Sequence, residues 1–331
     1  MPVHNAGAYL RPAVQSILAQ QDVLLELILI DDNSTDTAIQ SLPNDERLKI
    51  IQSPGRGIVT ALNFGLEQAR HPFIARMDGD DIAMPLRLSR QLTYLLDHPT
   101  VDIVGAKIEL FKDSGAVDRG YALYQDWINA LCDPLSIANN LFVESPIPHP
   151  TAFMRRSVLQ NLGGYNNTDW PEDYDLWCRA HLAGLRFGKP DGDALLHWRD
   201  YDQRTSRTDQ RYAKQQFIDC KAHYLSRYLK LQGHHQCSVW GAGPTGLKLH
   251  DGLLQNNVHV VQFVDINPKL KNRTKRQKPI YIIGTTPSES ELRAISTPCL
   301  IAVSARGARQ RIYTALNQAG LTEMQDFILA A

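Results

Sequence analysis

The sequence predicts an α/β protein with a mostly parallel sheet, helices on both faces of that sheet, and a second, smaller α/β domain. Three observations support this prediction. Apolar segments of strand length alternate with segments of helical periodicity. Turn-forming residues directly follow several of the apolar segments. A chain of 331 residues also exceeds the size of one ordinary compact core, so two domains are expected.

The first part of the chain supplies the alternation. The helical spacing of apolar residues over 9–20 predicts a helix, and the apolar run 24–30 predicts a buried parallel strand. Residues 48–52 and 72–77 predict two further strands, with a helix over 58–70 between them. Strands that alternate with helices in this way form a mostly parallel sheet that is covered on both faces.

The next segments are less regular. Pro85 is expected to open a helix, because proline suits the first helical turn, and residues 101–110 predict a strand. A further helix is expected after Pro171. Residues 207–232 are charged and aromatic and lack a strand pattern, so they predict a helical linker that follows a first domain over residues 1–206.

The second domain, residues 233–331, follows the pattern of strand, glycine turn, helix and strand. Its glycines fit the motif G-x-G-x-x-G, and an acidic residue ends the next strand. These nucleotide-binding candidates are Gly241, Gly243, Gly246 and Asp265. Only about 95 residues remain, enough for one mononucleotide-binding half. Three interpretations stay open: a nucleotide or nucleotide sugar, an NAD-type dinucleotide, or a tight turn needed only for packing.

The composition excludes several classes of function. The 35 basic and 35 acidic side chains cancel, so no global field attracts nucleic acid. The five cysteines form no CxxC pair, which disfavours a zinc site or a disulfide framework and favours a reducing, cytoplasmic location. We expect no transmembrane segment and no signal peptide, while peripheral contact with the inner face of a membrane stays open. The basic run 269–278 is expected to be a solvated loop.

The stretch "RMDGDDI", residues 76–82, places three carboxylates around one glycine at the end of an expected strand. In an open parallel sheet, ligands bind beyond the carboxyl ends of the strands, and Asp31 and Asp32 also follow a strand. Hard oxygen ligands of this kind suit Mg²⁺ or Mn²⁺ together with substrate phosphates. The sequence therefore predicts a metal site here, with a solvated turn as the alternative.

Five segments in a fixed order carry a family resemblance: "PVHNAGAYLRPAVQSILAQ", "LILIDDNSTD", "GIVTALNFGLEQARHPFIARMDGDDI", "HPTAFMRRSVLQNLGGY" and "EDYDLWCRA". Together they resemble the family 2 glycosyltransferases of GT-A fold over roughly residues 2–206. The resemblance implies an inverting, metal-dependent enzyme. It would move a sugar from a nucleoside diphosphate sugar, with UDP expected, to a glycan or lipid-linked hydroxyl in cell-surface polysaccharide synthesis.

The resemblance also implies roles for single residues. The donor-binding residues would be Pro2, Val3, Asn5, Asp31, Asp32, Asp78 and Arg199, and the ligands of Mn²⁺ or Mg²⁺ would be Asp78 and Asp80. The residues on the acceptor side or in support would be Asp81, His149, Tyr165 and Glu172. Asp173 would be the general base that removes the acceptor proton. Alternatively, Glu172 and Asp173 only offset a helix dipole, and Arg76 either contacts phosphate or pairs with the acids.

The sequence departs from the family pattern in two places. Tyr201 stands where the family has a histidine in its late "YRxH" segment, so a histidine metal ligand is not expected there. Family members normally begin with a strand of the kind "SVIMPVYN", whereas this chain starts at Met1. We therefore expect the first strand to be missing and a sheet edge to be exposed.

The second domain resembles the Rossmann-like domain that binds a nucleotide sugar in some sugar-nucleotide acetyltransferases, on "WGAGPTG", "FVDINP" and "LIAVSARGARQRIYTAL". Two other functions stay open, a non-catalytic nucleotide-sugar-binding protein and an NAD(P)-linked oxidoreductase that uses the C-terminal glycine motif. A nucleotidyltransferase is disfavoured, because no glycine-rich basic loop follows the first strand.

Overall fold

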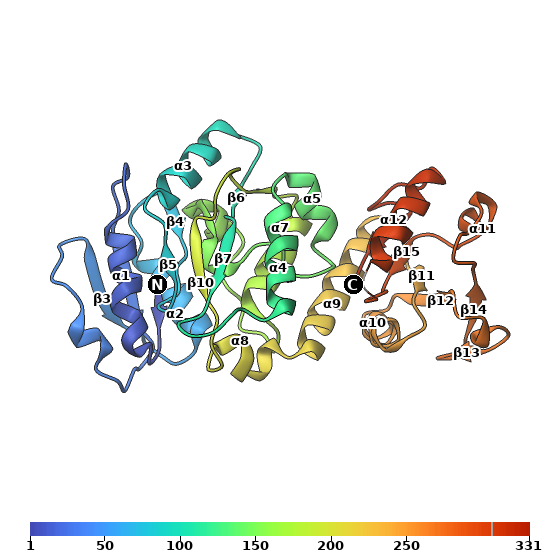
Figure 1. The fold of residues 1–331 in the computed structure, drawn as a ribbon, viewed down its shortest axis with the longest axis horizontal. Helices are drawn as coiled ribbons and strands as arrows, with labels where there is room; N and C mark the ends of the chain where they lie inside the picture. Colours follow the sequence, from blue (N-terminus) through green and yellow to red (C-terminus); the bar gives the residue numbers. More distant parts are fainter. Residues whose placement is uncertain (306) are drawn as a thin grey trace. The chain divides into compact units, whose positions relative to one another are not determined.

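The computed structural model of the chain describes residues 1–305 and 307–331, which form two compact units (Figure 1). The first unit comprises Met1–Ala138 and Pro146–Arg211, and the second comprises Asn139–Ser145 and Tyr212–Ala331. The division falls after Arg211 rather than near residue 233. The helical segment expected as a linker is therefore part of the second unit.

The first unit begins with a parallel sheet of order β1–β2–β3. Its strands are β1 (Pro2–Val3), β2 (Leu27–Asp31) and β3 (Leu48–Gln52), and its helices are α1 (Leu10–Leu18) and α2 (Ile58–Gln68). Leu10, Val14 and Ile17 form the buried stripe of α1 and join one apolar core with β2. Val3 pairs with Asp31, so the chain after β1 lies beside the residues that follow β2.

Two mixed sheets complete the first unit, in the orders β4–β8–β6–β9 and β5–β10–β7. Their strands are β4 (Phe73–Ala75), β5 (Ile82–Ala83), β6 (Ile103–Val104), β7 (Ile108–Phe111), β8 (Phe153–Arg155), β9 (Phe187–Gly188) and β10 (Leu196–Arg199). The pairs β7–β10 and β6–β9 are parallel, whereas β8 is antiparallel to β4 and β6, and β5 is antiparallel to β10. The single strand expected over 101–110 is two strands, because the chain passes from one sheet to the other.

The other helices of this part of the chain are α3 (Arg87–Asp97), α4 (Arg119–Ala130), α5 (Pro134–Asn140), α6 (Arg156–Asn161), α7 (Glu172–Leu182) and α8 (Thr205–Thr208). Short 3-10 turns are η1 (Gly7–Tyr9), η2 (Ala38–Ser41), η3 (His149–Thr151) and η4 (Gln210–Tyr212). Helix α7 begins directly after Pro171, as expected, and α3 begins just after Pro85. The sequence patterns did not predict α4 and α5.

The second unit is built on one sheet of order β13–β14–β12–β11–β15–β16. Its strands are β11 (Gln236–Trp240), β12 (His259–Asp265), β13 (Thr274–Lys275), β14 (Lys278–Ile282), β15 (Cys299–Ile301) and β16 (Phe327–Leu329). Strand β13 forms an antiparallel hairpin with β14, and the other neighbours are parallel. In chain order the parallel strands are arranged 3-2-1-4-5, as in a doubly wound nucleotide-binding sheet.

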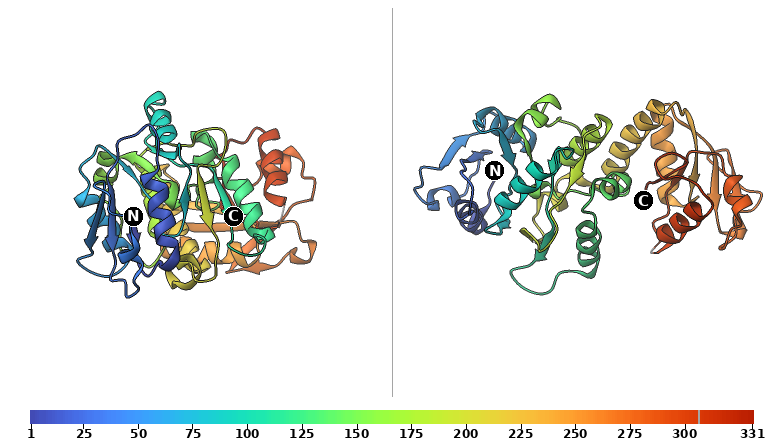
Figure 2. Two further views of the ribbon diagram at one scale, coloured as in Figure 1. Left: turned by 60° about the vertical axis from the view of Figure 1, so that its left-hand side comes forward. Right: turned by 90° about the horizontal axis from the view of Figure 1, so that it is seen from above.

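Helices cover both faces of this second sheet (Figure 2). They are α9 (Lys214–Leu231), α10 (Pro244–Gln255), α11 (Glu289–Arg293) and α12 (Ala308–Gln318), with the 3-10 turn η5 (Pro268–Leu270). Right-handed crossovers put α10 and α12 on opposite faces, because the strand order reverses at β11. Gly252 lets α10 approach α9, since a Cβ there would lie 2.6 Å from the Cβ of Ala222. In the two described ranges, no helix is both long and apolar enough to cross a membrane.

Candidate active site

Three carboxylates meet where β4 ends. Asp78, Asp80 and Asp81 lie in the turn between β4 and β5, and each offers an oxygen within 4.8 Å of the other two. Gly79 allows this turn to approach β1 and α1, because a Cβ at residue 79 would lie 3.3 Å from Val3 and 3.5 Å from Leu10. The structure thus brings together the acidic residues that the sequence predicted as one cluster.

Strand β10 and the segment that follows it hold this acidic turn. Arg199 donates its backbone N–H to Oδ1 of Asp81 (2.9 Å) and its Nε–H to the carbonyl oxygen of Asp80 (2.8 Å). Tyr201 donates its hydroxyl to Oδ2 of Asp80 (2.9 Å). Asp81 is buried, and its Oδ2 has no hydrogen-bond partner among the described residues. The turn is therefore fixed while one buried carboxylate oxygen stays unsatisfied.

The charges of the turn repel one another. Burial raises the pKa of Asp80, and the charge of Asp78 raises it further. Burial also raises the pKa of Asp81, with added contributions from Asp80 and Asp78. A cation would relieve this repulsion, and carboxylate oxygens are the ligands that Mg²⁺ and Mn²⁺ prefer. The clustered oxygens and the unsatisfied oxygen of Asp81 fit a divalent cation. Asp78 and Asp80 would bind the cation, and Asp81 would support them.

Arg199, the expected diphosphate contact, is held on several sides. Its guanidinium carbon lies 4.4 Å from the ring centres of both Tyr9 and Phe111, and the group pairs with Asp113. Phe111 is also its register partner between β7 and β10. The contacts of this buried arginine position the acidic turn, and its contact with a diphosphate stays a prediction. Sequence reasoning missed Tyr9, Phe111 and Asp113, because only the pairing of distant strands brings them to Arg199.

The residues expected against the nucleoside surround the ends of β1 and β2. The two carboxylate oxygens of Asp32 accept the N–H of Gly57 at 3.0 and 2.9 Å. Oδ1 of Asn5 accepts the N–H of Thr35 at 2.7 Å. These bonds tie the loop after β3 to the end of β2, and the loop after β2 to the N-terminal turn. The structure gathers all the expected residues here, namely Pro2, Val3, Asn5, Asp31 and Asp32, and their nucleoside contacts stay a prediction.

Helix α7 opens with Glu172 and Asp173. Oδ1 of Asp173 accepts the N–H of Tyr174 at 2.7 Å. Burial and the charge of Glu172 raise the pKa of Asp173 from 3.8 to about 7. A helix dipole alone would lower the pKa of acids at this end, so burial and mutual repulsion dominate here. A carboxylate with this pKa can accept a proton near neutral pH.

His149 connects Glu172 with Tyr165. Nδ1 of His149 lies 3.5 Å from Oε1 of Glu172, and its Nε2 lies 3.0 Å from the hydroxyl of Tyr165. Burial and the charge of Arg76 lower the pKa of His149, so the ring is neutral at pH 7. Burial raises the pKa of Tyr165, so this hydroxyl keeps its proton. The neutral ring can accept that proton in a hydrogen bond and donate its own N–H to Glu172.

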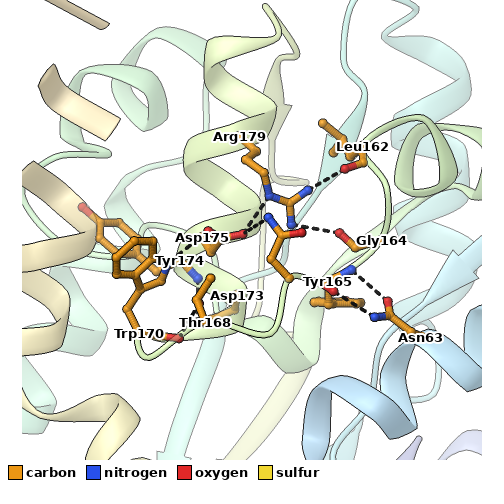
Figure 3. A network of polar contacts seen from close by, with 11 residues as sticks. Asn63, Leu162, Gly164, Tyr165, Thr168, Trp170, Asp173, Tyr174, Asp175 and Arg179 are labelled. Atoms are coloured by element: carbon orange, nitrogen blue, oxygen red, sulfur yellow. Dashed lines mark hydrogen bonds and ion pairs between the residues drawn. The ribbon is translucent and has the colours of Figure 1, made fainter. Parts of the chain in front are cut away.

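A polar network fixes the loop that precedes α7 (Figure 3). Arg179 donates to Oδ2 of Asp175 (2.7 Å) and to the carbonyl oxygen of Gly164 (2.8 Å). Asn63 of α2 exchanges two hydrogen bonds of 2.8 Å with the backbone of Tyr165. The loop is therefore tied to two helices, which fixes the backbone that carries the Tyr165 side chain. Sequence reasoning missed Asn63 and Arg179, although both lie in segments that carry the family resemblance, because no local pattern shows that they bond to this loop.

Arg76 lies between the acidic turn and the start of α7. Its Nη1 pairs with Asp78, so the salt-bridge interpretation of this residue is present in the structure. The side chain is buried, and its Nε has no hydrogen-bond partner within residues 1–305 and 307–331. Its charge opposes the increase in the pKa of Asp173 that burial and Glu172 cause. One guanidinium thus acts on both groups of acids.

A comparison with known families supports the resemblance of the first part of the chain. Residues 1–163 match the model described as "Glycosyl transferase family 2". This match covers just under half of the chain and shows that these residues are similar to glycosyl transferase family 2. The matched segment includes the sheet β1–β2–β3 and the acidic turn, whereas α7 follows it in the chain.

Two relatives extend the family 2 assignment. An uncharacterized glycosyltransferase of Haemophilus influenzae is 31% identical over 212 residues, which cover 61% of this chain and 65% of that protein. The O-antigen biosynthesis glycosyltransferase WbnJ of Escherichia coli is 28% identical over 239 residues, which cover 70% of this chain and 87% of that protein. The chain thus spans just under two thirds of the Haemophilus relative. Both relatives are named glycosyltransferases, which agrees with the expected enzyme class.

A solved structure supports the fold of the family 2 unit. S. aureus TarS 1-349 in complex with UDP-GlcNAc matches with a TM-score of 0.52 and 18% identity over 76% of this chain and 70% of that chain. The match shows a shared fold. The predicted α/β architecture of the GT-A type is therefore confirmed.

In the second unit, the predicted glycines form the turn between β11 and α10. Gly241 has a φ of 118°, and a Cβ there would lie 2.7 Å from the carbonyl oxygen of Ala302. A Cβ at Gly246 would lie 1.8 Å from the carbonyl oxygen of Gly241, so only glycine fits. Asp265 accepts the N–H of Ala242 at 2.9 Å and closes the turn. Gly241, Gly243, Gly246 and Asp265 thus meet around one turn, and ligand binding there stays a prediction.

Proposed function

We propose that the first unit transfers a sugar from a nucleoside diphosphate sugar, with UDP as the nucleotide, to a hydroxyl group of a glycan or lipid-linked acceptor. The observation that carries this proposal is the arrangement around Arg76. This residue pairs with Asp78 of the acidic turn, and its charge acts on Asp173 of α7. The match to family 2 supports the reaction class, and the UDP-GlcNAc complex of TarS supports the choice of UDP.

In this proposal, Asp173 takes the proton of the acceptor hydroxyl. The acceptor oxygen bonds to the anomeric carbon while the bond from that carbon to the diphosphate oxygen breaks, and the electron pair leaves with the nucleoside diphosphate. Attack from the face opposite the leaving group inverts the anomeric configuration. A divalent cation held by Asp78 and Asp80 would supply Lewis-acid stabilisation of the charge on the leaving group.

The residues around Asp173 set its basicity. A carboxylate with an ordinary pKa near 3.8 would be a weak base, whereas a pKa of about 7 matches neutral conditions. Glu172 contributes the repulsion that raises this pKa, and its contact with the neutral His149 holds it in place without cancelling its charge. We assign Tyr165 and His149 to the acceptor side, as supports for this pair of acids.

The proposed function is tested by measuring the release of UDP from a panel of UDP-sugars, with and without Mn²⁺. We expect metal-dependent UDP release that increases with a suitable acceptor. Asp80→Ala should abolish both turnover and the metal-dependent binding of UDP, while Asp97→Ala, which removes an exposed carboxylate of α3, should change neither. Unchanged transfer by Asp80→Ala would overturn the metal assignment.

The biological setting is also a proposal. The E. coli relative is named for O-antigen biosynthesis, which supports a role for this chain in cell-surface polysaccharide synthesis. A lipid-linked acceptor would require the enzyme to work beside a membrane, on its cytoplasmic face. Sedimentation of the native enzyme with membranes, and its release by salt, would measure this association.

For the second unit we propose a nucleotide or nucleotide sugar as the ligand. The strand order 3-2-1-4-5 favours this class, because such sheets bind nucleotides where the order reverses, here between β11 and β15. A fluorescence titration of the Asp80→Ala variant, in which the first unit should no longer bind UDP, would distinguish the two ligand classes by the response of Trp240, at the end of β11, to UDP-sugars and to NADH. Saturation by NADH alone would favour the dinucleotide interpretation, and no response to either would leave the glycines with a packing role only.

A further inference from the structure

A basic hairpin in the second unit carries charge that the proposed reaction does not use. We define it as residues 269–278, whose basic side chains are Lys269, Lys271, Arg273, Lys275, Arg276 and Lys278, with no acidic residue among them. It extends from η5 through β13 to the first residue of β14 (Figure 1). Lys275 and Lys278 are half-buried, and the other four basic residues are exposed. Within the described ranges, Arg276 alone of the six forms an ion pair, with Asp251 at 2.6 Å.

The basic hairpin has two features that lower its stability. Lys275 and Lys278 are direct register partners, and like charges in this position destabilise an antiparallel pair. The two turn residues, Arg276 and Gln277, have φ angles of 50° and 61°. Glycine and asparagine adopt this region at much lower cost, and Asn-Gly is the preferred pair for such a turn. Local conflicts of this kind are expected where the charges serve a function.

An anionic lipid surface fits these side chains better than other polyanions do. Ile266, which is 50% exposed, lies just before the basic hairpin and offers an aliphatic group beside its charges. Basic and aliphatic side chains together suit the headgroup region of a bilayer. Residues 266–278 contain no aromatic side chain, so they lack the stacking groups that single-stranded nucleic acid uses.

We propose that the basic hairpin binds the surface of a membrane that contains anionic phospholipid, with Ile266 contacting the headgroup region. The binding is local, because the whole chain has no net charge. It does not depend on the transferase proposal, since the residues concerned lie in the second unit and include none of the acids of the first. A basic side chain near such a surface strengthens binding by roughly fivefold.

The test is cosedimentation of the full chain with vesicles of phosphatidylcholine alone and of phosphatidylcholine with phosphatidylglycerol. We expect binding to the anionic vesicles only, and weaker binding when the salt concentration rises. The triple variant Lys271→Gln, Arg273→Gln and Lys278→Gln should bind about a hundredfold more weakly. Ile266→Ser should weaken binding less, and without changing its salt dependence.

A matched control removes the same charge from elsewhere in the second unit. Lys214→Gln, Lys248→Gln and Arg311→Gln together change three exposed basic residues of α9, α10 and α12. This control should bind anionic vesicles as the unmodified chain does. Unfolding temperatures of both triple variants show whether the unit is intact.

Three outcomes would overturn the proposal: equal binding to both kinds of vesicle, equal losses in the two triple variants, and binding that salt does not weaken. A competition experiment adds inorganic phosphate or a short single-stranded oligonucleotide to the anionic vesicles. Displacement from vesicles by submillimolar free phosphate would reassign the site to a small anion. Tighter binding of the oligonucleotide than of the vesicles would reassign it to nucleic acid.

Discussion

Replacing Asp173 with asparagine should make the protein more stable and the enzyme inactive. The pKa of this carboxyl is raised from 3.8 to about 7, so the folded state binds its proton more tightly than the unfolded state does. A raised carboxyl pKa destabilises the folded state increasingly as the pH rises from about 4 to about 7. Above pH 7 the full cost is present, and below pH 4 it vanishes. Asparagine has no charge to bury, so it removes this cost.

The magnitude follows from the size of the shift. A difference of about 3 pKa units corresponds to about 4 kcal/mol, which is an upper limit because Glu172 shares the repulsion. We therefore expect Asp173→Asn to stabilise the first unit by about 1–3 kcal/mol at pH 8, or about 3–10 °C in Tm for a unit of this size. The gain should shrink steadily toward pH 4.

The assay combines thermal unfolding at several pH values with a measurement of transfer. Asp173→Asn should lower turnover by about 10²–10⁴-fold, the contribution of a general base, and leave the Kd for UDP with Mn²⁺ unchanged. The control Asp169→Asn removes an exposed carboxyl of the neighbouring loop and should alter neither property. A stability gain that is the same at pH 8 and pH 5 would refute the reasoning, and so would transfer at the normal rate.

Three more predictions concern the pH profile, the metal and the second unit. Glu172→Gln removes the charge that raises the pKa of Asp173, so the acid limb of kcat/KM should move down by about one pH unit. Tyr201→Phe removes the hydrogen bond to Asp80, and calorimetry should find Mn²⁺ with UDP bound about tenfold more weakly. Gly246→Ala places a Cβ against a carbonyl oxygen, and urea unfolding should show the second unit destabilised by about 3 kcal/mol.

Each of these predictions has a control and a contrary outcome. As a control for Glu172→Gln, Glu67→Gln removes an exposed carboxylate of α2 and should leave the pH profile unchanged. An acid limb that moves to higher pH in Glu172→Gln would contradict the repulsion between Glu172 and Asp173. Equal Mn²⁺ affinity in Tyr201→Phe would mean that the phenol does not position Asp80. Gly243→Ala meets nothing within 4 Å and should be tolerated; equal damage there would show that the turn tolerates no side chain at all.

The acidic turn could be predicted from sequence, because its position depends on local signals. An apolar strand followed by acids and a glycine indicates a ligand site at the carboxyl edge of a sheet, and Asp78, Asp80 and Asp81 do meet there. The same logic predicted the glycine turn of the second unit around Gly241. In both cases the residues that matter are neighbours in the chain.

The supports of the acidic turn could not be predicted, because they depend on long-range pairing. Phe111 and Arg199 are register partners across β7 and β10, and no local pattern fixes that register. The boundary between the two units also could not be predicted from composition, because it too depends on contacts between residues that are distant in the chain. Lys221 of α9 donates to the carbonyl oxygens of Val143 and Ala330, which ties the segment Asn139–Ser145 to the second unit without any marker in the sequence.

The two interpretations that the sequence allowed for Arg76 are compatible in the folded protein. The ion pair with Asp78 uses Nη1, while the buried Nε keeps a donor without a partner among the described residues. A cation beside Asp78 would compete with the guanidinium for that carboxylate, and a diphosphate would offer it a new acceptor. The positive charge of Arg76 also lowers the pKa of Asp173. If the guanidinium moves from Asp78 to the diphosphate of the donor, this effect weakens, and Asp173 becomes a stronger base once the donor is bound. Arg76 is therefore the residue through which binding of the donor can act on the proposed base.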